Sequence, residues 1–381
     1  MLSSRTSFDL SPNPLSVALA RARAERRPIL DLTESNPTRA SIPYDRDAIL
    51  QALAAPGSLV YEPAPFGLPS ARQVVAGHLS LSPSRVVLTA STSEAYGFLF
   101  KLLCDPGDEV LVPVPSYPLF EYLARLEGVT AVPYRLAYDG TWHVDVASAR
   151  AALGPRTRAV VVVSPNNPTG SYVKRGEMEQ LAALGLPILS DEVFASYPLR
   201  DDPTRLASAL EGPAPLVFAL GGLSKLAALP QMKLGWIAIG GEATLVDPAL
   251  ARLEVVADAF LSVGAPVQHA LATLLATRAS AEGAIAQRAR DNLADLRTSV
   301  ASTALSVLDV EGGWYATLRV PRTRSEEAWA LALLEKDDVY VHPGHFFDFE
   351  SEAYLVVSLL TPPSIFREGV AKIVARVGGD A

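Results

Sequence analysis

The sequence predicts an α/β fold in which a mostly parallel sheet lies between helices, together with a smaller α+β unit. Between about residues 70 and 240, short apolar runs with β character alternate with helical patterns, as is typical of successive βαβ units. The last part of the chain instead reads as strand, helix, strand, strand and helix. That order favours a second, α+β unit at the C-terminal end.

The elements follow in chain order. A helical segment over residues 16–27 stops at Pro28, and proline-rich connectors come after it. The sheet is expected at six apolar runs, which are RVVLTA, EVLVPVP, RAVVVVS, LPILS, LVFALGG and GWIAIGG. A long helical region, from about 248 to 308, leads into the C-terminal unit. The strands of this unit are expected at WYATLRV, VYVHP and YLVVSLL, and its helices at 325–336 and 364–376.

Composition limits the classes of function. A chain of 381 residues that is 49% hydrophobic can bury a large core and fits two domains. A net charge of −8 without a basic run argues against nucleic acid and anionic membranes as partners. The single cysteine, Cys104, permits no internal disulfide, and the polar N-terminus lacks the apolar core of a signal peptide. We therefore expect a cytoplasmic protein that acts on small molecules.

Polar residues follow four of the expected strands, where ligands bind in open α/β sheets. Ser91, Thr92 and Ser93 open a helical pattern after VVLTA, so they either cradle a phosphate or cap the helix. Asn166 and Asn167 form a turn in PNNPTG. Whether Asn167 also donates to a ligand stays open at this point.

The next two endings supply a carboxylate and an amine. Asp191 follows PILS and Lys225 follows VFALGGLS; taken singly, they could be a helix cap or ion-pair partner and an exposed lysine. The four endings together share one chemical logic. A cationic heterocycle with a phosphate tail needs an anion cradle, a carboxylate for its ring nitrogen, a donor for its phenolate and an amine that forms an imine.

An ordered set of motifs extends this reading from about Asp31 to the C-terminal helix. The set comprises LTESNPT, YEPAPFGLPSAR, LTASTSEAYGFLFKLLCDPGDEVLVPVPSYP, VVSPNNPTG, SDEVF and GGLSKLAALPQMKLGW. In this order it resembles the fold-type I pyridoxal 5′-phosphate (PLP) enzymes, specifically the class I/II aminotransferases of the aspartate aminotransferase superfamily. The resemblance implies a seven-stranded, mostly parallel sheet in a large PLP-binding domain over 45–285. It also implies a small domain built from 1–44 and 286–381.

The resemblance further implies roles for single residues. Lys225 resembles the lysine that forms the internal aldimine and then moves the substrate proton. Asp191 is similar to the carboxylate that keeps the pyridine nitrogen protonated, Asn167 to the amide that binds the phenolate oxygen, and Tyr117 to the ring that stacks on the pyridine. The residues implied at the phosphate are Ser91, Thr92, Ser93, Ser224 and Lys233, with Tyr61 reaching the partner's cofactor in a homodimer. Those implied at the substrate are Asn36, Tyr117 and Asn167.

The activity implied is a PLP-dependent aminotransferase that moves an amino group from an amino acid to a 2-oxo acid in a ping-pong cycle. A PLP-dependent lyase or decarboxylase could reuse the same residues. A non-catalytic sensor with the inherited fold is the third reading. The presence of Lys225, Asp191 and Asn167 together argues against that last reading.

Three positions depart from the family pattern. Phe194 stands where many members have a tyrosine that also bonds the phenolate, and Lys233 stands where an arginine usually binds the phosphate. Val356 occupies the position of the arginine that pairs with the substrate's α-carboxylate. Either another cation takes that role or the substrate has no such carboxylate. The candidate cations are Arg39, Lys233, Arg319 and His345.

Overall fold

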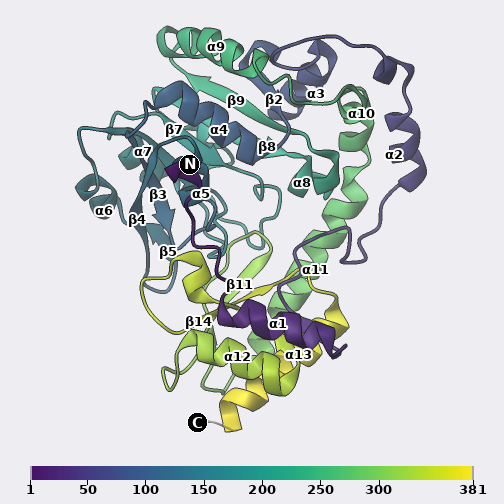
Figure 1. Cartoon of the computed structure of the whole chain (residues 1–381), viewed down its shortest axis with the longest axis vertical. Helices are drawn as coiled ribbons and strands as arrows, with labels where there is room; N and C mark the ends of the chain where they lie inside the picture. Colours follow the sequence, from purple (N-terminus) through teal and green to yellow (C-terminus); the bar gives the residue numbers. More distant parts are fainter. Residues whose placement is uncertain (1, 380–381) are drawn as a thin grey trace.

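The computed structural model describes residues 2–379. Its upper part in Figure 1 is built around an eight-stranded sheet with the order β2-β9-β8-β7-β6-β3-β4-β5. The strands are β2 (Val86–Thr89), β3 (Glu109–Val114), β4 (Thr130–Tyr138), β5 (Trp142–Val144), β6 (Thr157–Val163), β7 (Ile188–Asp191), β8 (Leu216–Gly222) and β9 (Gly235–Gly241).

The sheet is mostly parallel, as predicted. Strands β8, β7, β6, β3 and β4 run parallel to their neighbours in this order, whereas β9 is antiparallel to both β8 and β2. These are the seven strands that the resemblance implies. The eighth, β5, is a three-residue antiparallel edge strand that pairs with residues 136–138 of β4. So short a strand gives little periodic signal in a sequence.

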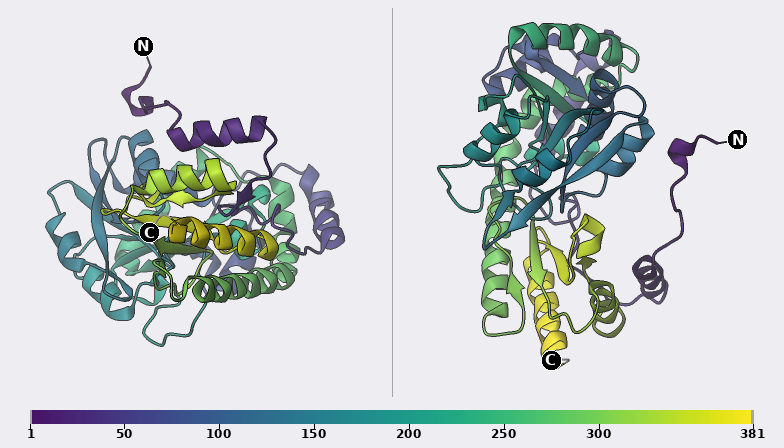
Figure 2. Two further views of the ribbon diagram at one scale, coloured as in Figure 1. Left: turned by 90° about the horizontal axis from the view of Figure 1, so that it is seen from below. Right: turned by 90° about the vertical axis from the view of Figure 1, so that its left-hand side faces the viewer.

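Helices cover both faces of this sheet, so its strands are nearly continuous apolar runs. In β6, residues 159, 161 and 163 pack toward one helical layer and residues 160 and 162 toward the other. The first layer (Figure 2) contains α4 (Thr92–Leu103), α5 (Phe120–Leu126) and α9 (Ala243–Asp258). The second contains α3 (Pro69–Leu79), α6 (Val146–Ala151), α7 (Arg175–Ala182) and α10 (Ala265–Ala276), with α2 (Arg46–Leu53) packed beside α10.

The lower part has its own core. An antiparallel sheet with the order β10-β11-β14-β13 lies against helices, and β1 pairs with β12 beside it. The strands are β1 (Leu30–Asp31), β10 (Ser306–Val307), β11 (Tyr315–Arg319), β12 (Val339–Tyr340), β13 (His342–Pro343) and β14 (Tyr354–Ser358). The helices are α1 (Pro14–Ala24), α12 (Glu326–Asp337) and α13 (Pro363–Gly379). One buried cluster unites residues 15–32 with residues 289–377, which supports the two-domain division that we propose.

The expected helical region of 248–308 is divided into three helices. Helix α9 ends at Asp258, and α10 begins only at Ala265, beside the helix-starting Pro266. Helix α11 (Arg278–Val300) then runs unbroken from the upper part into the lower part (Figure 1). The boundary that we propose between residues 285 and 286 therefore lies inside a continuous helix.

Trp329 tests the core of the lower part. Its side chain is fully buried on α12, and its Nε1 donates to the Pro321 carbonyl at 3.0 Å. We expect Trp329→Ala to lower the free energy of unfolding by about 3–5 kcal/mol, because it removes a large packed ring and leaves a cavity. Urea denaturation followed by circular dichroism measures this change. The exposed Lys336→Ala on the same helix is the control, and equal stability of the two variants would contradict the packing described.

Candidate active site

Strand register brings the predicted residues together at the carboxyl ends of the central strands, which form one edge of the large sheet. Val163 at the end of β6 pairs with Asp191 of β7, and Asp191 pairs with Leu220 of β8. The loop after β6 carries Asn167, and β8 continues into the short helix α8 (Leu223–Leu226), which carries Lys225. Parallel strands in register place their carboxyl ends side by side. An amide, a carboxylate and an amine thus arise from three adjacent strands.

Two glycines bring the phosphate-cradle residues to the same edge. Gly235 of β9 pairs with Thr89 of β2 on one side and with Gly222 of β8 on the other. A Cβ atom on Gly222 would lie 3.0 Å from the Gly235 Cα, and one on Gly235 would lie 3.2 Å from the Ser91 carbonyl carbon. The backbones approach this closely because neither residue has a side chain. The start of α4 consequently lies next to the segment that leads to Lys225.

The Lys225 amine lies between aromatic rings. Its Nζ is 5.3 Å from the Phe194 ring centroid and 5.0 Å from that of Trp314. Burial lowers the pKa of Lys225 to about 8, against the opposing influence of the Asp191 charge. A desolvated lysine of this kind exists partly as the unprotonated amine near neutral pH, which is the form that attacks a carbonyl carbon or accepts a proton.

The pKa of Asp191 is shifted in the opposite direction, upward. Burial raises the pKa of its carboxyl to about 6, although hydrogen bonds from the Val193 amide and the Tyr96 hydroxyl lower it. Both donors lie 3.2 Å from a carboxylate oxygen. Above pH 6 the group is a buried anion at the end of β7. Such an anion favours a cationic partner, as a protonated heterocyclic nitrogen would be.

The two asparagines of the loop after β6 have different surroundings. Asn166 is fully used, since its Nδ2 donates to Pro115 O (3.0 Å) and Thr169 Oγ1 (2.9 Å) and its Oδ1 accepts from Ser116 Oγ (2.6 Å). Asn167 is 7% exposed, and its Oδ1 is buried without a hydrogen-bond partner among residues 2–379. The side chain of Asn166 therefore stabilises the loop, whereas the oxygen of Asn167 is left available to a ligand or a water molecule.

The remaining predicted residues divide between this edge and the surface. Tyr117 is 44% exposed, and its pKa is raised by burial and by the Asp191 charge. Ser91 caps α4 by accepting from the Glu94 amide at 3.2 Å, so the capping interpretation holds for it. Thr92 and Ser93 form the first turn of α4, and Ser224 precedes Lys225 on α8.

Three further predicted residues lie outside this group of side chains. Lys233 is exposed and has a left-handed backbone with φ at +51°, just before β9. Tyr61 is 80% exposed on the loop before α3. Asn36 forms a local turn in which its Oδ1 accepts from the Thr38 amide (3.0 Å) and hydroxyl (2.7 Å). The side-chain NH₂ group is then the part of Asn36 left to donate to a substrate.

Val356 offers no charge to a substrate. It is 1% exposed on β14, and it pairs with Thr317 of β11 and His342 of β13. Among the candidate cations, His345 pairs with Glu326 at 3.3 Å, and the Arg319 guanidinium lies 5.9 Å from the Tyr138 ring centroid. Arg39 and Lys233 are exposed.

The structure adds three residues that the sequence reasoning did not single out. They are Tyr96, which donates to Asp191, Trp314, whose ring faces the Lys225 amine, and Tyr197, whose hydroxyl donates to the Lys225 carbonyl at 2.7 Å. Each is a buried aromatic residue, and burial alone does not distinguish it from a core residue. Only the three-dimensional contacts reveal the role.

The geometry agrees with what comparison with known proteins finds. The family model described as aminotransferase class I and II matches residues 27–370. The chain belongs to this family. The alanine aminotransferase of Mycobacterium tuberculosis is 29% identical in an alignment that covers 96% of this chain and 88% of that protein. The glutamate-pyruvate aminotransferase AlaA of Haemophilus influenzae is 26% identical, with 81% and 80% covered.

Solved structures show the same fold. The alanine aminotransferase from Pyrococcus furiosus has a TM-score of 0.89 at 21% identity and covers 99% of both chains. The aspartate aminotransferase from Thermotoga maritima has a TM-score of 0.84 at 22% identity, with 98% and 99% covered. The predicted fold class and PLP-dependent aminotransferase activity are thereby confirmed. The members of this family exchange amino groups between amino acids and 2-oxo acids with PLP as cofactor.

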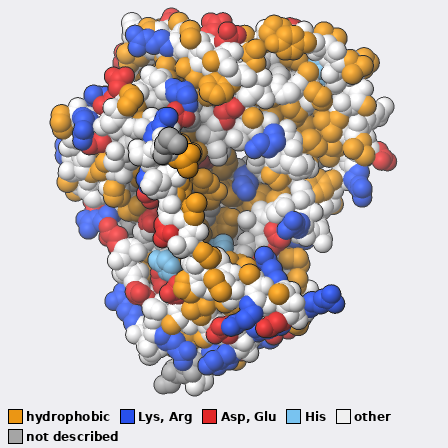
Figure 3. Space-filling view, in the orientation of Figure 1, with side chains coloured by type: hydrophobic (Ala, Val, Ile, Leu, Met, Phe, Trp, Pro, Cys, Tyr) orange, Lys and Arg blue, Asp and Glu red, His pale blue; other side chains and the backbone are white. Residues whose placement is uncertain are grey.

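The described residues fit PLP. The buried Asp191 anion suits a protonated ring nitrogen, the low-pKa Lys225 amine suits an aldehyde carbon, and the Asn167 side chain, whose oxygen has no hydrogen-bond partner among residues 2–379, is not committed to the fold. The space-filling view is hollowed between the upper and lower parts, close to this edge (Figure 3). Across residues 2–379, none of the helices is both long and apolar enough to span a bilayer.

Asp191→Asn tests the coupling between the two buried groups. The Asp191 charge raises the pKa of Lys225, so its removal should lower that pKa below the present value of about 8. The pH dependence of Lys225 modification by an amine reagent, followed in the apoprotein by mass spectrometry, measures it. Tyr96→Phe is the control because it keeps the carboxylate, which is ionised at pH 8. An unchanged or raised pKa in Asp191→Asn would show that the two groups do not interact.

Proposed function

We propose that Lys225 binds the cofactor covalently and is the base that moves the substrate proton in this aminotransferase. The observation that carries the proposal is its amine, with a pKa lowered to about 8, held between Phe194 and Trp314 beside Asp191. An amine with a pKa near the working pH is suited to accept and return a proton. When bound, PLP supplies the electron sink for that chemistry.

The surrounding residues have supporting roles in this proposal. Asp191 binds the ring nitrogen as an anion, and Asn167 donates from its side-chain NH₂ group to the phenolate oxygen. Tyr117, whose pKa the Asp191 charge raises, covers the ring. The phosphate is bound by the start of α4, where amide groups and the helix dipole favour an anion. The side chains that contribute there are Ser91, Thr92, Ser93, Ser224 and Lys233.

For the substrate, we propose an amino acid donor and a 2-oxo acid acceptor that use the same site in turn. The relatives named as alanine and glutamate-pyruvate aminotransferases support small amino acids as donors. Because Val356 is uncharged, we assign a larger share of carboxylate binding to Asn36. Its oxygen is occupied by Thr38, so its NH₂ group is the donor that remains. Tyr117 and Asn167 complete the proposed substrate contacts.

A homodimer is the assembly that we propose. Exposed apolar side chains cluster on and around the segment that carries Tyr61: Leu50 (63% exposed), Leu59 (93%), Val60 (61%) and Phe260 (51%). In Figure 3 hydrophobic side chains gather on the upper right, over α2 and α10. An apolar patch of this kind favours association with another chain. Tyr61 would then reach the phosphate site of the partner subunit.

Lys225→Ala tests the central assignment. We expect the rate of the half-reaction with an amino acid donor to fall by at least about 10²-fold, the usual contribution of a positioned base. Single-turnover absorbance of the bound cofactor, with alanine, glutamate and amines that lack a carboxylate as donors, measures it. Lys336→Ala, on the surface of α12, is the control. Release of ammonia or CO₂ by the wild type would instead indicate a lyase or decarboxylase.

Tyr61→Phe tests the shared site. The variant keeps the ring and removes only the hydroxyl, so we expect weaker PLP binding with an unchanged dimer mass. Titration of the apoprotein with PLP and sedimentation velocity measure the two quantities. Tyr122→Phe, at another exposed tyrosine, on α5 (45% exposed), is the control. Equal PLP affinity of both variants would exclude a role for Tyr61 at the phosphate.

A further inference from the structure

A short segment of the lower part is inserted between the two loops that carry the cofactor-ring residues. Residues 309–313 lie between the loop after β6 and the loop after β7. Four backbone hydrogen bonds hold the segment there: from Glu311 N (3.3 Å) and Gly312 N (2.9 Å) to Gly170 O, from Leu199 N to Glu311 O (2.9 Å) and from Gly313 N to Tyr197 O (2.9 Å). Both loops are thus joined through one peptide segment.

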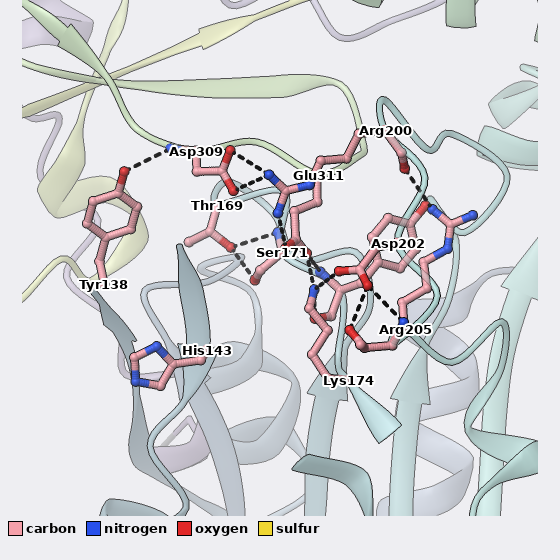
Figure 4. A network of polar contacts seen from close by, with 12 residues as sticks. Tyr138, His143, Thr169, Ser171, Lys174, Arg200, Asp202, Arg205, Asp309 and Glu311 are labelled. Carbon is pink, nitrogen blue, oxygen red and sulfur yellow. Dashed lines mark hydrogen bonds and ion pairs between the residues drawn. The ribbon is translucent and has the colours of Figure 1, made fainter. Parts of the chain in front are cut away.

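Glu311 occupies the centre of this junction with a buried carboxylate. Its side chain is 3% exposed, and Figure 4 shows the cations that surround it. Oε2 accepts from the Tyr172 amide at 2.8 Å and pairs with the Lys174 amine, while Oε1 pairs with Arg200 Nη2 at 2.7 Å. Each oxygen therefore has a charged partner. A buried carboxylate is stable only with such complete pairing.

On one side, Glu311 fixes the base of the Asn167 turn. Tyr172 and Lys174 end the loop in which Gly170 N donates to Asn166 O and Asn166 N donates to Ser171 O, both at 2.8 Å. Gly170 has a φ of +72°, and a Cβ atom there would lie 2.7 Å from Gly312 O. The turn and the inserted segment fit together only through this glycine. The position of Asn167 therefore depends on where Glu311 is held.

On the other side, the same segment reaches the Lys225 amine. Tyr197, which accepts from the Gly313 amide, donates its hydroxyl to the Lys225 carbonyl at 2.7 Å. Trp314 follows Gly313 directly, and its ring lies 5.1 Å from the Tyr197 ring and 5.0 Å from Lys225 Nζ. The segment 309–313 thus fixes the position of the Trp314 ring beside the Lys225 amine.

We propose that Glu311 is a positioning residue, which fixes the position of Asn167 relative to Lys225 through its pairs with Lys174 and Arg200. The proposal rests on the function proposed above for Lys225 and Asn167. Glu311 touches neither residue. It fixes the two loops and the Trp314 ring, so that the Asn167 side chain and the Lys225 amine face the same ligand. Without the Glu311 charge, Lys174 keeps Asp202 at 3.6 Å and Arg200 keeps Asp309 at 2.9 Å, but the two cations no longer share an anion, so the two loops are less firmly joined.

Glu311→Gln tests the proposal, because it keeps the shape of the side chain and removes the charge. We expect PLP to bind roughly tenfold more weakly, as befits the loss of a well-placed hydrogen bond to a charged group. The pH midpoint of the bound cofactor's absorbance should rise, since a displaced Asn167 stabilises the phenolate less. Both are measured by absorbance titration of the holoenzyme, with melting temperature recorded alongside.

Asp108→Asn is the matched control. Asp108 is also a buried carboxylate, 6% exposed and paired with Arg158 at 2.9 Å, but it precedes β3 at the opposite edge of the sheet. We expect this variant to lose melting temperature while PLP affinity and the absorbance midpoint stay at wild-type values. If Glu311→Gln matches Asp108→Asn in both cofactor readouts, Glu311 is structural only and the proposal is overturned.

Two further variants keep the outcome interpretable. Tyr197→Phe removes a single hydroxyl from the link to Lys225, so it tests the same connection should Glu311→Gln fail to fold. A shifted absorbance midpoint in Tyr197→Phe supports the proposal, and an unchanged midpoint overturns it. Lys225→Ala reports on the proposed function separately. If that variant still forms the wild-type absorbance band, the assignment of Lys225 is wrong, whatever the result at Glu311.

Discussion

The parallel register of β6, β7 and β8 is the constraint on which the site depends. Because Val163, Asp191 and Leu220 lie side by side, the residues that follow them emerge at one edge of the sheet. A shift of one residue would turn each side chain to the opposite face. The helical layers on both faces fix the register, since alternate residues of β6 pack into different clusters. The chemistry at the edge thus depends on packing within the sheet.

The environment at this edge moves two pKa values toward each other. Burial lowers the pKa of Lys225 to about 8 and raises that of Asp191 to about 6. Both shifts reduce the charge that the protein buries, and the electrostatic attraction between the groups opposes both. Two titratable groups with strongly shifted pKa values next to an unpartnered amide are typical of an active site. Aromatic rings around Lys225 provide the desolvation without competing for its proton.

Much of the fold and of the site could be predicted from the sequence. The apolar runs marked the central strands because a doubly covered sheet has continuous hydrophobic segments, and the residues after them marked Asn167, Asp191 and Lys225. Strands β4 and β5 and the division of the 248–308 region escaped prediction. Strand β4 is only partly buried and has no continuous apolar run, and three-residue strands and short breaks between helices leave weak periodic signals. Tyr96, Tyr197 and Trp314 escaped because their roles come from contacts between elements far apart in the chain.

Helix α11 links the two parts of the molecule by a covalent, hydrogen-bonded rod. Its 23 residues span roughly 35 Å at the usual rise per residue. Gly283 lies in its interior, close to the passage between the parts, and a Cβ atom there would meet no other atom within 4 Å. Packing therefore does not demand glycine at this point, while its backbone freedom makes the helix locally most compliant. A bend of about 5° at such a place would displace the far end of the helix by roughly 2 Å, and the hydrogen bonds between residues 309–313 and the two loops of the upper part would have to accommodate that displacement.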